Sequence, residues 1–334
     1  MLNLVTFGII LAHAGIAYSE PQLYEVNDRK FLQQSFTMPK HLSEGLNTRP
    51  IIGVLTQPLS EDQKSDHRYK GKTSYIMSSY IDYLKSAGAR TVPLIYDGNL
   101  DDELAKIDHL NGVFYCGGSG AGAYDVFGKK VFEKVKKMND EGNYLPIWGT
   151  CLGFEDLAMY ASDNSDKTLS PFNADDESYS ISYLVPPKDT KMYSILGDDA
   201  HVFEKYNITY NHHSYGVSPD AFNLDQGLAS IFTPTSISYD DDGKPFVASM
   251  ESKQYPFYAT QFHPEKAQFI FYPKTKIDHS TISIFYNRYF GDMFVNQCKQ
   301  NNNHFKSYEV EESFRTENFG TVVTKAYDGV DFVF

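Results

Sequence analysis

The stretch that most constrains the fold is residues 144–160, which read YLPIWGTCLGFEDLAMY. An apolar run around Trp148 predicts a buried strand, and apolar residues recur at helical spacing after Gly153. A strand, Gly-x-Cys-x-Gly and a helix, in this order, are typical of a sharp turn that presents a nucleophile above a parallel sheet. The two glycines indicate a turn too crowded for a Cβ atom. The alternative is a buried structural cysteine, but the flanking strand and helix favour Cys151 as a nucleophile.

The start of a helix is a favourable place for cysteine chemistry. The partial positive charge of a helix N-terminus favours the thiolate, which is the form of Cys151 that attacks. The next backbone N–H, that of Leu152, points to where a carbonyl oxygen gathers negative charge during the attack. We therefore expect Leu152 to form part of an oxyanion hole.

Apolar strand runs alternate with helical segments through the first half of the chain. Strands are predicted at 51–55, 91–95, 112–115 and around Leu145, and helices at 76–84, 101–107 and 125–138, the last with Val126, Val131 and Val135 facing inward. This alternation predicts an α/β fold with an open, mostly parallel sheet flanked by helices. Ligands of such sheets bind at the carboxyl ends of the strands, where Gly117, Gly118 and Cys151 fall.

Short β runs replace this pattern from about residue 180 and predict an added β-rich section. They lie at 181–185, 208–210, 246–250 and 257–260, and a long helix is predicted at 282–298. Residues 240–243 lack the ligand spacing of a calcium loop and indicate a hairpin turn. Since no repeat or low-complexity linker is visible, one catalytic domain over 49–305 is favoured, with 306–334 as a tail on that domain.

Composition excludes several classes of partner and site. The formal net charge of −13 argues against nucleic acid and anionic membranes as partners. Three cysteines, with no Cys-x-x-Cys and no His-Glu-x-x-His, predict neither a disulfide framework nor a metal site. No cofactor is expected, and a homodimer is left open.

The N-terminal residues indicate secretion. Residues 1–19 are apolar and end in small residues, which is typical of a secretory signal peptide, and the apolar run is too short for a membrane anchor. Residues 20–48 form an N-terminal arm without an assigned role. We expect the mature protein to be extracellular, lysosomal or vacuolar, free of the membrane, with a glycan on Asn207.

A cysteine nucleophile needs a base, and the base needs a group that fixes its tautomer. His263 follows the apolar run 257–262 and precedes Glu265 by two residues. Residues two apart in an extended chain point to the same side, so Glu265 can accept a hydrogen bond from His263. Considered alone, a histidine in this position is more often a surface residue at a strand end. The glycine turn at 117–118 is the expected source of a second oxyanion donor.

Three blocks of the sequence together resemble the γ-glutamyl hydrolase family. They are WGTCLGFE at 148–155, QFHPEK at 261–266 and FYCGGS at 114–119, and shorter matches extend the resemblance over about residues 49–305. The resemblance implies a class I glutamine-amidotransferase-like fold, with three flavodoxin-like layers. It also implies hydrolysis of the γ-glutamyl bonds of folylpoly-γ-glutamates, which are small polyanionic molecules.

The resemblance implies a role for each matching residue. Cys151 is implied as the nucleophile that forms a γ-glutamyl thioester, His263 as the general base and acid, and Glu265 as its orienting group. Gly118 and Leu152 are implied as the oxyanion donors. The implied substrate-binding residues are Tyr75, Glu155, His213, Gly117 and Ser119, with His212 as a competitor of His213. Cys116 departs from the family, which often has proline there, and is interpreted as a small buried residue near the site.

Two other functions stay open. A glutaminase that releases ammonia would use the same acyl group, although no synthase domain or channel partner is visible. A non-catalytic paralogue would bind without turnover, but the intact Cys151, His263 and Glu265 argue against it. Because the chain is acidic, attraction of a polyanion has to be local. The candidate cations are Lys266, Arg68, Lys70 and Lys72.

Overall fold

The structure is a computed structural model that describes residues 45–324 and 329–334, and these residues belong to one compact unit. The predicted signal peptide at 1–19, and the arm at 20–48 except for its end, lie outside the described residues. Within the described ranges, no helix is long and apolar enough to cross a membrane.

An eight-stranded sheet forms the centre of the unit, in the order β4-β1-β5-β6-β12-β11-β10-β8. The first five strands are parallel and the last three are antiparallel, which confirms the predicted mostly parallel α/β sheet. The bounds are β4 Arg90–Leu94, β1 Ile51–Leu55, β5 Gly112–Tyr115, β6 Ile147–Thr150, β12 Phe257–Thr260, β11 Pro245–Ser252, β10 Phe232–Tyr239 and β8 Ser182–Tyr183.

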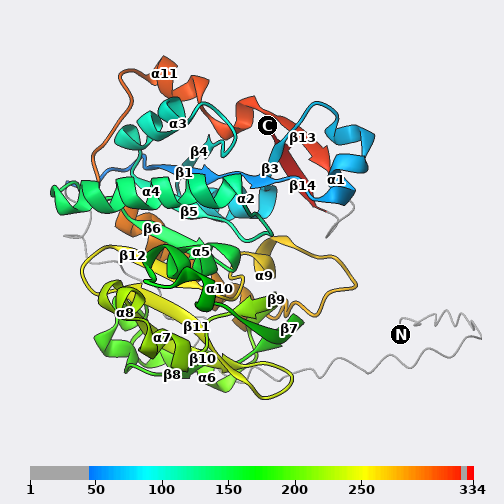
Figure 1. Ribbon diagram of the computed structural model, residues 1–334, viewed down its shortest axis with the longest axis vertical. Coiled ribbons are helices and arrows are strands. Elements are labelled where there is room, and N and C mark those ends of the chain that lie inside the picture. Colours follow the sequence, from blue (N-terminus) through cyan, green and yellow to red (C-terminus); the bar gives the residue numbers. More distant parts are fainter. Residues whose placement is uncertain (1–44, 325–328) are drawn as a thin grey trace, which may run out of the picture. The chain divides into compact units, whose positions relative to one another are not determined.

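Helices cover both faces of this sheet because alternate residues of its strands are apolar on both sides. On β5, Val113 and Tyr115 join the apolar cluster beneath one set of helices. Phe114 points to the other face, where its ring lies 5.8 Å from that of Tyr80 and 6.0 Å from that of Phe294. The first face carries α3 Leu100–Lys106, α4 Ala123–Asp140 and α5 Leu152–Ala161, and the second carries α2 Ser78–Ser86, α9 Lys266–Phe269 and α10 Thr281–Cys298 (Figure 1).

Two smaller sheets flank the central one. One has the order β13-β14-β3-β2, and the other pairs β7 with β9. Their bounds are β13 Gly320–Val323, β14 Val330–Val333, β3 Ser74–Met77, β2 Gln57–Pro58, β7 Ser170–Tyr179 and β9 Thr209–Gly216. Figure 1 shows the late strands β13 and β14 beside β3, which lies far earlier in the chain.

The pairing of β3 with β14 corrects one prediction. The helix expected at 76–84 begins only at Ser78, because Tyr75 and Ile76 pair with Val333 and Phe332 of β14. No local pattern in the sequence signals a partner this distant. The predicted tail at 306–334 therefore contains a hairpin, β13 and β14, that is part of the fold.

Helix α4 differs from its prediction in one inward-facing residue. Val131 and Val135 are fully buried, but Val126 is 59% exposed, because the buried stripe of this helix runs through Phe127 instead.

The turn predicted at 240–243 is confirmed and connects β10 to β11. The shorter helices are α1 Glu61–Ser65, α6 Val202–Lys205, α7 Pro219–Leu224, α8 Gln226–Ile231 and α11 Tyr308–Ser313, with 3-10 turns at His67–Tyr69, Ile107–His109, Ser165–Lys167, Pro187–Asp189, Ser194–His201 and Thr316–Asn318.

The glycines around Cys151 allow α5 to pack directly on the sheet. A Cβ atom at Gly153 would lie 2.3 Å from the carbonyl oxygen of Tyr115, and one at Gly149 would lie 2.4 Å from the carbonyl oxygen of Gly153. Both contacts are with backbone, which cannot move away cheaply. The predicted crowding of the turn is therefore confirmed.

We expect Gly153→Ala to destabilise the protein by about 2 kcal/mol, because the new methyl group overlaps the backbone of β5. Gly320→Ala is the matched control, since a Cβ atom there would meet only a methyl group of Val333 at 3.8 Å. Urea unfolding should show a lower midpoint for Gly153→Ala alone. Equal midpoints for the two variants would contradict the packing described for α5.

Candidate active site

Cys151 lies in a strained turn between β6 and α5. Its φ of 53° and ψ of −109° place it in the left-handed half of backbone space, which is uncommon for a residue with a Cβ atom. The backbone N–H of Cys151 donates a hydrogen bond of 2.9 Å to the carbonyl oxygen of Thr260, so the turn is fixed to β12. Strain held in this way is typical of a nucleophile elbow.

Strand pairing brings His263 to the same edge of the sheet. Thr150 of β6 pairs in parallel with Thr260 of β12, so the residues that follow both strands emerge together. Gly117 lies between the two side chains. A Cβ atom there would come within 3.2 Å of Cys151 Cβ and 2.8 Å of His263 Cε1. The structure thus places the predicted nucleophile and the predicted base around one glycine.

Glu265 holds the ring of His263 as predicted. The distance from His263 Nδ1 to Glu265 Oε1 is 2.9 Å, and both side chains are buried. Burial lowers the pKa of His263, although Glu265 opposes this. Burial acts to raise the pKa of Glu265, but the neighbouring His263 and Lys266 outweigh it and lower this pKa overall. A neutral ring therefore donates from Nδ1 to a carboxylate, and its Nε2 can accept a proton.

The thiol of Cys151 is held in its protonated form. Burial raises its pKa well above the usual value, and Glu155 adds to this rise. The Leu152 N–H and the Lys266 ammonium act in the opposite direction but do not prevail. The start of the helix favours the thiolate, as predicted, but desolvation of the buried thiolate outweighs this effect. The proton has to be removed by a base during attack.

The turn after β5 is held from two sides. The Gly117 N–H donates to the hydroxyl of Tyr80 at 3.0 Å. On the other side, Gln57 Oε1 accepts from the Gly120 N–H at 3.2 Å, and Gln57 Nε2 donates to the hydroxyl of Tyr124 at 2.8 Å. Because the Gly117 N–H already bonds to Tyr80, the amide predicted as an oxyanion donor is that of the next residue, Gly118.

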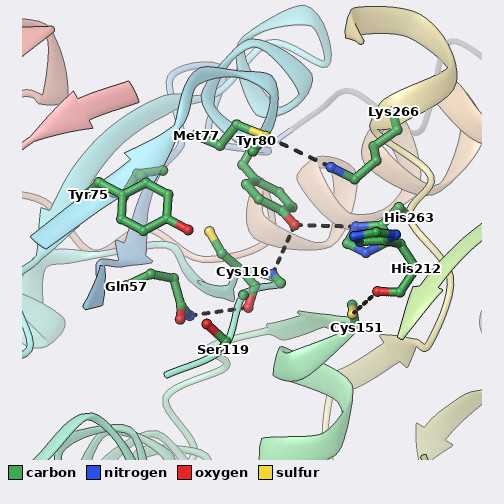
Figure 2. Close-up of a pocket in the computed structure, with 13 residues that line it drawn as sticks. Gln57, Tyr75, Met77, Tyr80, Cys116, Ser119, Cys151, His212, His263 and Lys266 are labelled. Carbon is green, nitrogen blue, oxygen red and sulfur yellow. Dashed lines mark hydrogen bonds between the residues drawn. The ribbon is translucent and has the colours of Figure 1, made fainter. Parts of the chain in front are cut away.

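A cavity of about 250 Å³ opens above Cys151 (Figure 2). Six of the residues predicted for the site line it: Tyr75, Gly117, Gly118, Ser119, Cys151 and His263. The other lining residues are Gln57, Ile76, Met77, Tyr80, Cys116, His212 and Lys266. Glu265 supports the ring of His263 from behind, and Leu152 follows Cys151 at the start of α5. Among the candidate cations, the structure brings Lys266 to the cavity, where it is almost fully buried.

Tyr80 is a site residue that the sequence analysis did not assign. Its hydroxyl lies 3.3 Å from His263 Nδ1 as well as accepting from Gly117, so one oxygen contacts both the base and the glycine turn. Tyr80 follows Tyr75 in the same sequence block, but Tyr75 belongs to β3 and Tyr80 to α2. To assign Tyr80 from the sequence, one would need to know that β3 ends at Met77 and that α2 begins at Ser78.

The two neighbouring histidines of β9 point to different surroundings. His212 lines the cavity, and its carbonyl oxygen lies 3.9 Å from Cys151 Sγ. His213 is buried elsewhere, with Nδ1 2.7 Å from the carbonyl oxygen of Tyr215 and its ring packed edge-on against Phe246. Burial lowers the pKa of His213 to about 3, so its ring is neutral. The histidine at the cavity is therefore His212, and His213 supports the strand.

Glu155 and Cys116 are both buried beside the reacting thiol. Glu155 accepts a hydrogen bond of 3.0 Å from Gln261, and burial raises its pKa to about 8. The sulfur of Cys116 points toward Tyr75 and Tyr80 in Figure 2, away from Cys151. Burial raises the pKa of Cys116 also, which fits its interpretation as a small buried residue.

The fold and this site together define a class of enzyme. A cysteine on a strained strand-to-helix turn, with histidine and glutamate just after the neighbouring parallel strand, is the arrangement of a class I glutamine amidotransferase. The family model for glutamine amidotransferase class I matches residues 74–270.

Within that class, curated relatives narrow the assignment. The chain is 34% identical to γ-glutamyl hydrolase B of Dictyostelium discoideum, over 79% of this chain and 76% of the relative. It is 31% identical to γ-glutamyl hydrolase of Homo sapiens, over 83% and 86% of the two chains. It is 29% identical to probable γ-glutamyl hydrolase 3 of Arabidopsis thaliana, over 92% and 90%. The chain belongs to the γ-glutamyl hydrolase family, as its sequence blocks predict.

We expect Tyr80→Phe to lower kcat about tenfold with little change in KM, because it leaves the Gly117 amide unpaired and frees the ring of His263. Tyr83→Phe is the matched control. Tyr83 lies on the same helix, and its buried hydroxyl bonds to Asn287 and Gly291, away from the cavity. Steady-state kinetics on a γ-glutamyl substrate separate the two. If both variants lost kcat equally, the role of Tyr80 would be structural only.

Glu155 should make stability depend on pH. A pKa raised to about 8 means that folding favours the protonated carboxyl, so its contribution is complete near pH 4 and declines as pH rises toward 8. We expect the free energy of unfolding of wild type to fall, relative to that of Glu155→Gln, by on the order of 3 kcal/mol over this window. Denaturant unfolding from pH 4 to pH 9 measures the difference. Glu133→Gln, on the surface of α4, is the control, and parallel profiles would refute the assignment.

Proposed function

We propose that this protein hydrolyses the γ-glutamyl peptide bonds of folylpoly-γ-glutamates through a thioester on Cys151. The observation that supports this most directly is that Cys151 and His263 line one cavity and that His263 is bonded to Glu265 at 2.9 Å. The relatives at 29% to 34% identity carry the name γ-glutamyl hydrolase, which supports the same bond type.

The first half of the proposed reaction forms the acyl-enzyme. His263 Nε2 takes the proton of the thiol as sulfur attacks the γ-carbonyl carbon, and the carbonyl oxygen becomes an oxyanion. The N–H groups of Gly118 and Leu152 stabilise that charge. His263 then passes its proton to the nitrogen of the departing glutamate, the C–N bond breaks, and the γ-glutamyl thioester stays on Cys151.

The second half releases the product. His263 takes a proton from water, and the resulting hydroxide attacks the thioester carbonyl. The C–S bond breaks, and the imidazolium of His263 returns its proton to the sulfur. The γ-carboxylic acid leaves and loses its proton to solvent. Glu265 stabilises the imidazolium that forms in both halves, so burial of this pair does not prevent it from carrying a proton.

The choice of bond is tested with three substrates: pteroyl-γ-linked pentaglutamate, its α-linked isomer and free glutamine. We expect rapid cleavage of the γ-linked chain and essentially none of the α-linked chain. The α-linked isomer places a side-chain carboxylate where the site expects an α-carboxylate and an amine, which leaves buried polar groups unpaired. Glutamine has the correct acyl group but lacks the extended leaving group, so it should react slowly. Chromatography of the products measures how much of each of the three substrates is cleaved.

Cys151→Ala is the control for the chemistry, since it removes the nucleophile and adds no bulk. We expect an unchanged unfolding midpoint and no hydrolysis by this variant. Ammonia from glutamine as the main product of wild type would instead indicate a glutaminase. If wild type with a reduced thiol turned over none of the three, the protein would be a non-catalytic paralogue.

We also propose that the mature protein is extracellular, lysosomal or vacuolar, with a glycan on Asn207. Asn207 is exposed in the loop before β9, where a glycan can be attached. Its modification depends on secretion, and the signal peptide that would direct secretion lies outside the described residues.

A further inference from the structure

A fully buried carboxyl on α5 has no role in the proposed mechanism. Asp156 lies on the helix that begins after Cys151, and its side chain has no exposure to solvent. Burial raises the pKa of Asp156 well above its usual value, although a hydrogen bond from Tyr124 opposes the rise. An apolar residue would fill this place more favourably, because burial of a carboxyl costs free energy. Departures of this kind are expected where a residue serves function.

A chain of hydrogen bonds leads from Asp156 to the glycine turn after β5. The hydroxyl of Tyr124 donates to Asp156 Oδ2 at 2.9 Å. The same hydroxyl accepts from Gln57 Nε2 at 2.8 Å, and Gln57 Oε1 accepts from the Gly120 N–H at 3.2 Å. The side chains of Gln57 and Tyr124 are buried, so water competes little for these bonds.

The acceptor at Asp156 sets the direction of the whole chain. A tyrosine hydroxyl has one proton, so while it donates to Asp156 it can only accept from Gln57. The amide nitrogen of Gln57 then faces Tyr124, and its amide oxygen faces the Gly120 N–H. If the acceptor were removed, the hydroxyl proton could turn toward Gln57. The amide would then flip and set its NH₂ group against the Gly120 N–H.

Gln57 also packs closely against the turn. A Cβ atom on Gly118 would lie 2.5 Å from Gln57 Oε1, and one on Gly120 would lie 2.5 Å from Cδ1 of Tyr124. Gln57 Nε2 lies 3.5 Å from the carbonyl oxygen of Cys116, at the start of the turn (Figure 2). A movement of Gln57 would therefore displace the backbone that carries the Gly118 N–H.

Two fixed amides flank the expected oxyanion donor. The hydroxyl of Tyr80 accepts from the Gly117 N–H, and Gln57 accepts from the Gly120 N–H. The Gly118 N–H belongs to the short segment between them, so both bonds restrict its direction. Oxyanion donors act only when they point to the place where charge develops, so their direction affects the rate.

We propose that Asp156 positions the oxyanion donor of Gly118 through Tyr124 and Gln57. This inference rests on the proposed function and assigns three positioning residues to the same reaction. Asp156 acts as an acceptor of a hydrogen bond, a role that a carboxyl fills whether it is ionised or protonated.

The test compares two reactions of the same cysteine. Hydrolysis of pteroyl-γ-linked diglutamate forms an oxyanion, whereas alkylation of Cys151 by iodoacetamide does not, because sulfur displaces iodide from a methylene carbon. For Tyr124→Phe and Asp156→Leu we expect kcat of hydrolysis to fall about tenfold, with KM within about twofold of wild type. The alkylation rate should stay within about twofold of wild type, because the thiol and its base are unchanged. Unfolding midpoints show whether each variant is folded, and Tyr124→Phe carries the test if Asp156→Leu is not.

Further variants test the chain itself. Asp156→Asn keeps an oxygen that accepts from Tyr124, so its kcat should stay within about threefold of wild type. Tyr124→Phe already breaks the chain, so adding Asp156→Leu to it should lower kcat no further. Tyr115→Phe is the matched control, because the buried hydroxyl of Tyr115 donates at 2.8 Å to the carbonyl oxygen of Gly128 on α4. Its kcat should equal that of wild type.

Several results would overturn the inference. Alkylation that slowed in step with hydrolysis would mean that the chain supports the whole site and not the oxyanion donor. Losses that added up in the double variant would mean that Asp156 and Tyr124 act separately. A loss in Asp156→Asn as large as that in Asp156→Leu would show that an acceptor is not what the turn requires. In these cases wild type still cleaves the γ-linked bond and the proposed function stands. No cleavage by wild type would remove the proposed function and this inference with it.

Discussion

The parallel pairing of β6 with β12 is the constraint on which the site depends. It sets Thr150 opposite Thr260, and the Cys151 N–H extends the pairing by one more hydrogen bond to Thr260. Nucleophile and base therefore emerge from adjacent strands at one edge, although they lie more than a hundred residues apart in the chain. A slip of one residue would turn every side chain of β12 to the other face of the sheet.

Exclusion of water has opposite effects on the members of the site. It keeps the thiol of Cys151 protonated and the ring of His263 neutral, but Glu265 stays ionised because it has a hydrogen-bonded partner. The site therefore holds a weak nucleophile beside a base that can accept its proton. Such an arrangement limits side reactions of the thiol until a carbonyl group is present to receive the electrons.

The local chemistry of the site could be predicted from the sequence, and its distant contacts could not. Cys151, His263 and Glu265 each lie in a short block whose strand, turn or spacing indicates a role. The predicted helix includes Ile76, which pairs with Phe332 of β14 instead, because that strand partner comes near the end of the described chain. Alternation along a strand separates His212 from His213, but β7 pairs with β9 through register shifts on both sides of Ala174, so the face of each residue is not readable from spacing. The orientation of Tyr80 depends on where β3 ends, which is set by the same distant pairing.

That pairing also has a consequence for how the chain is made. The cavity wall formed by Tyr75 and Met77 belongs to β3, and β14 pairs with it through Val333, Phe332 and Asp331. On the ribosome, the residues of β3 emerge early, and they wait for a partner until almost all of the described chain has been translated. Cys151 and His263 can meet before then, but the wall beside them is not yet built. A nascent chain thus carries an unfinished cavity, and its substrate-binding form arises only when synthesis has passed the last strand.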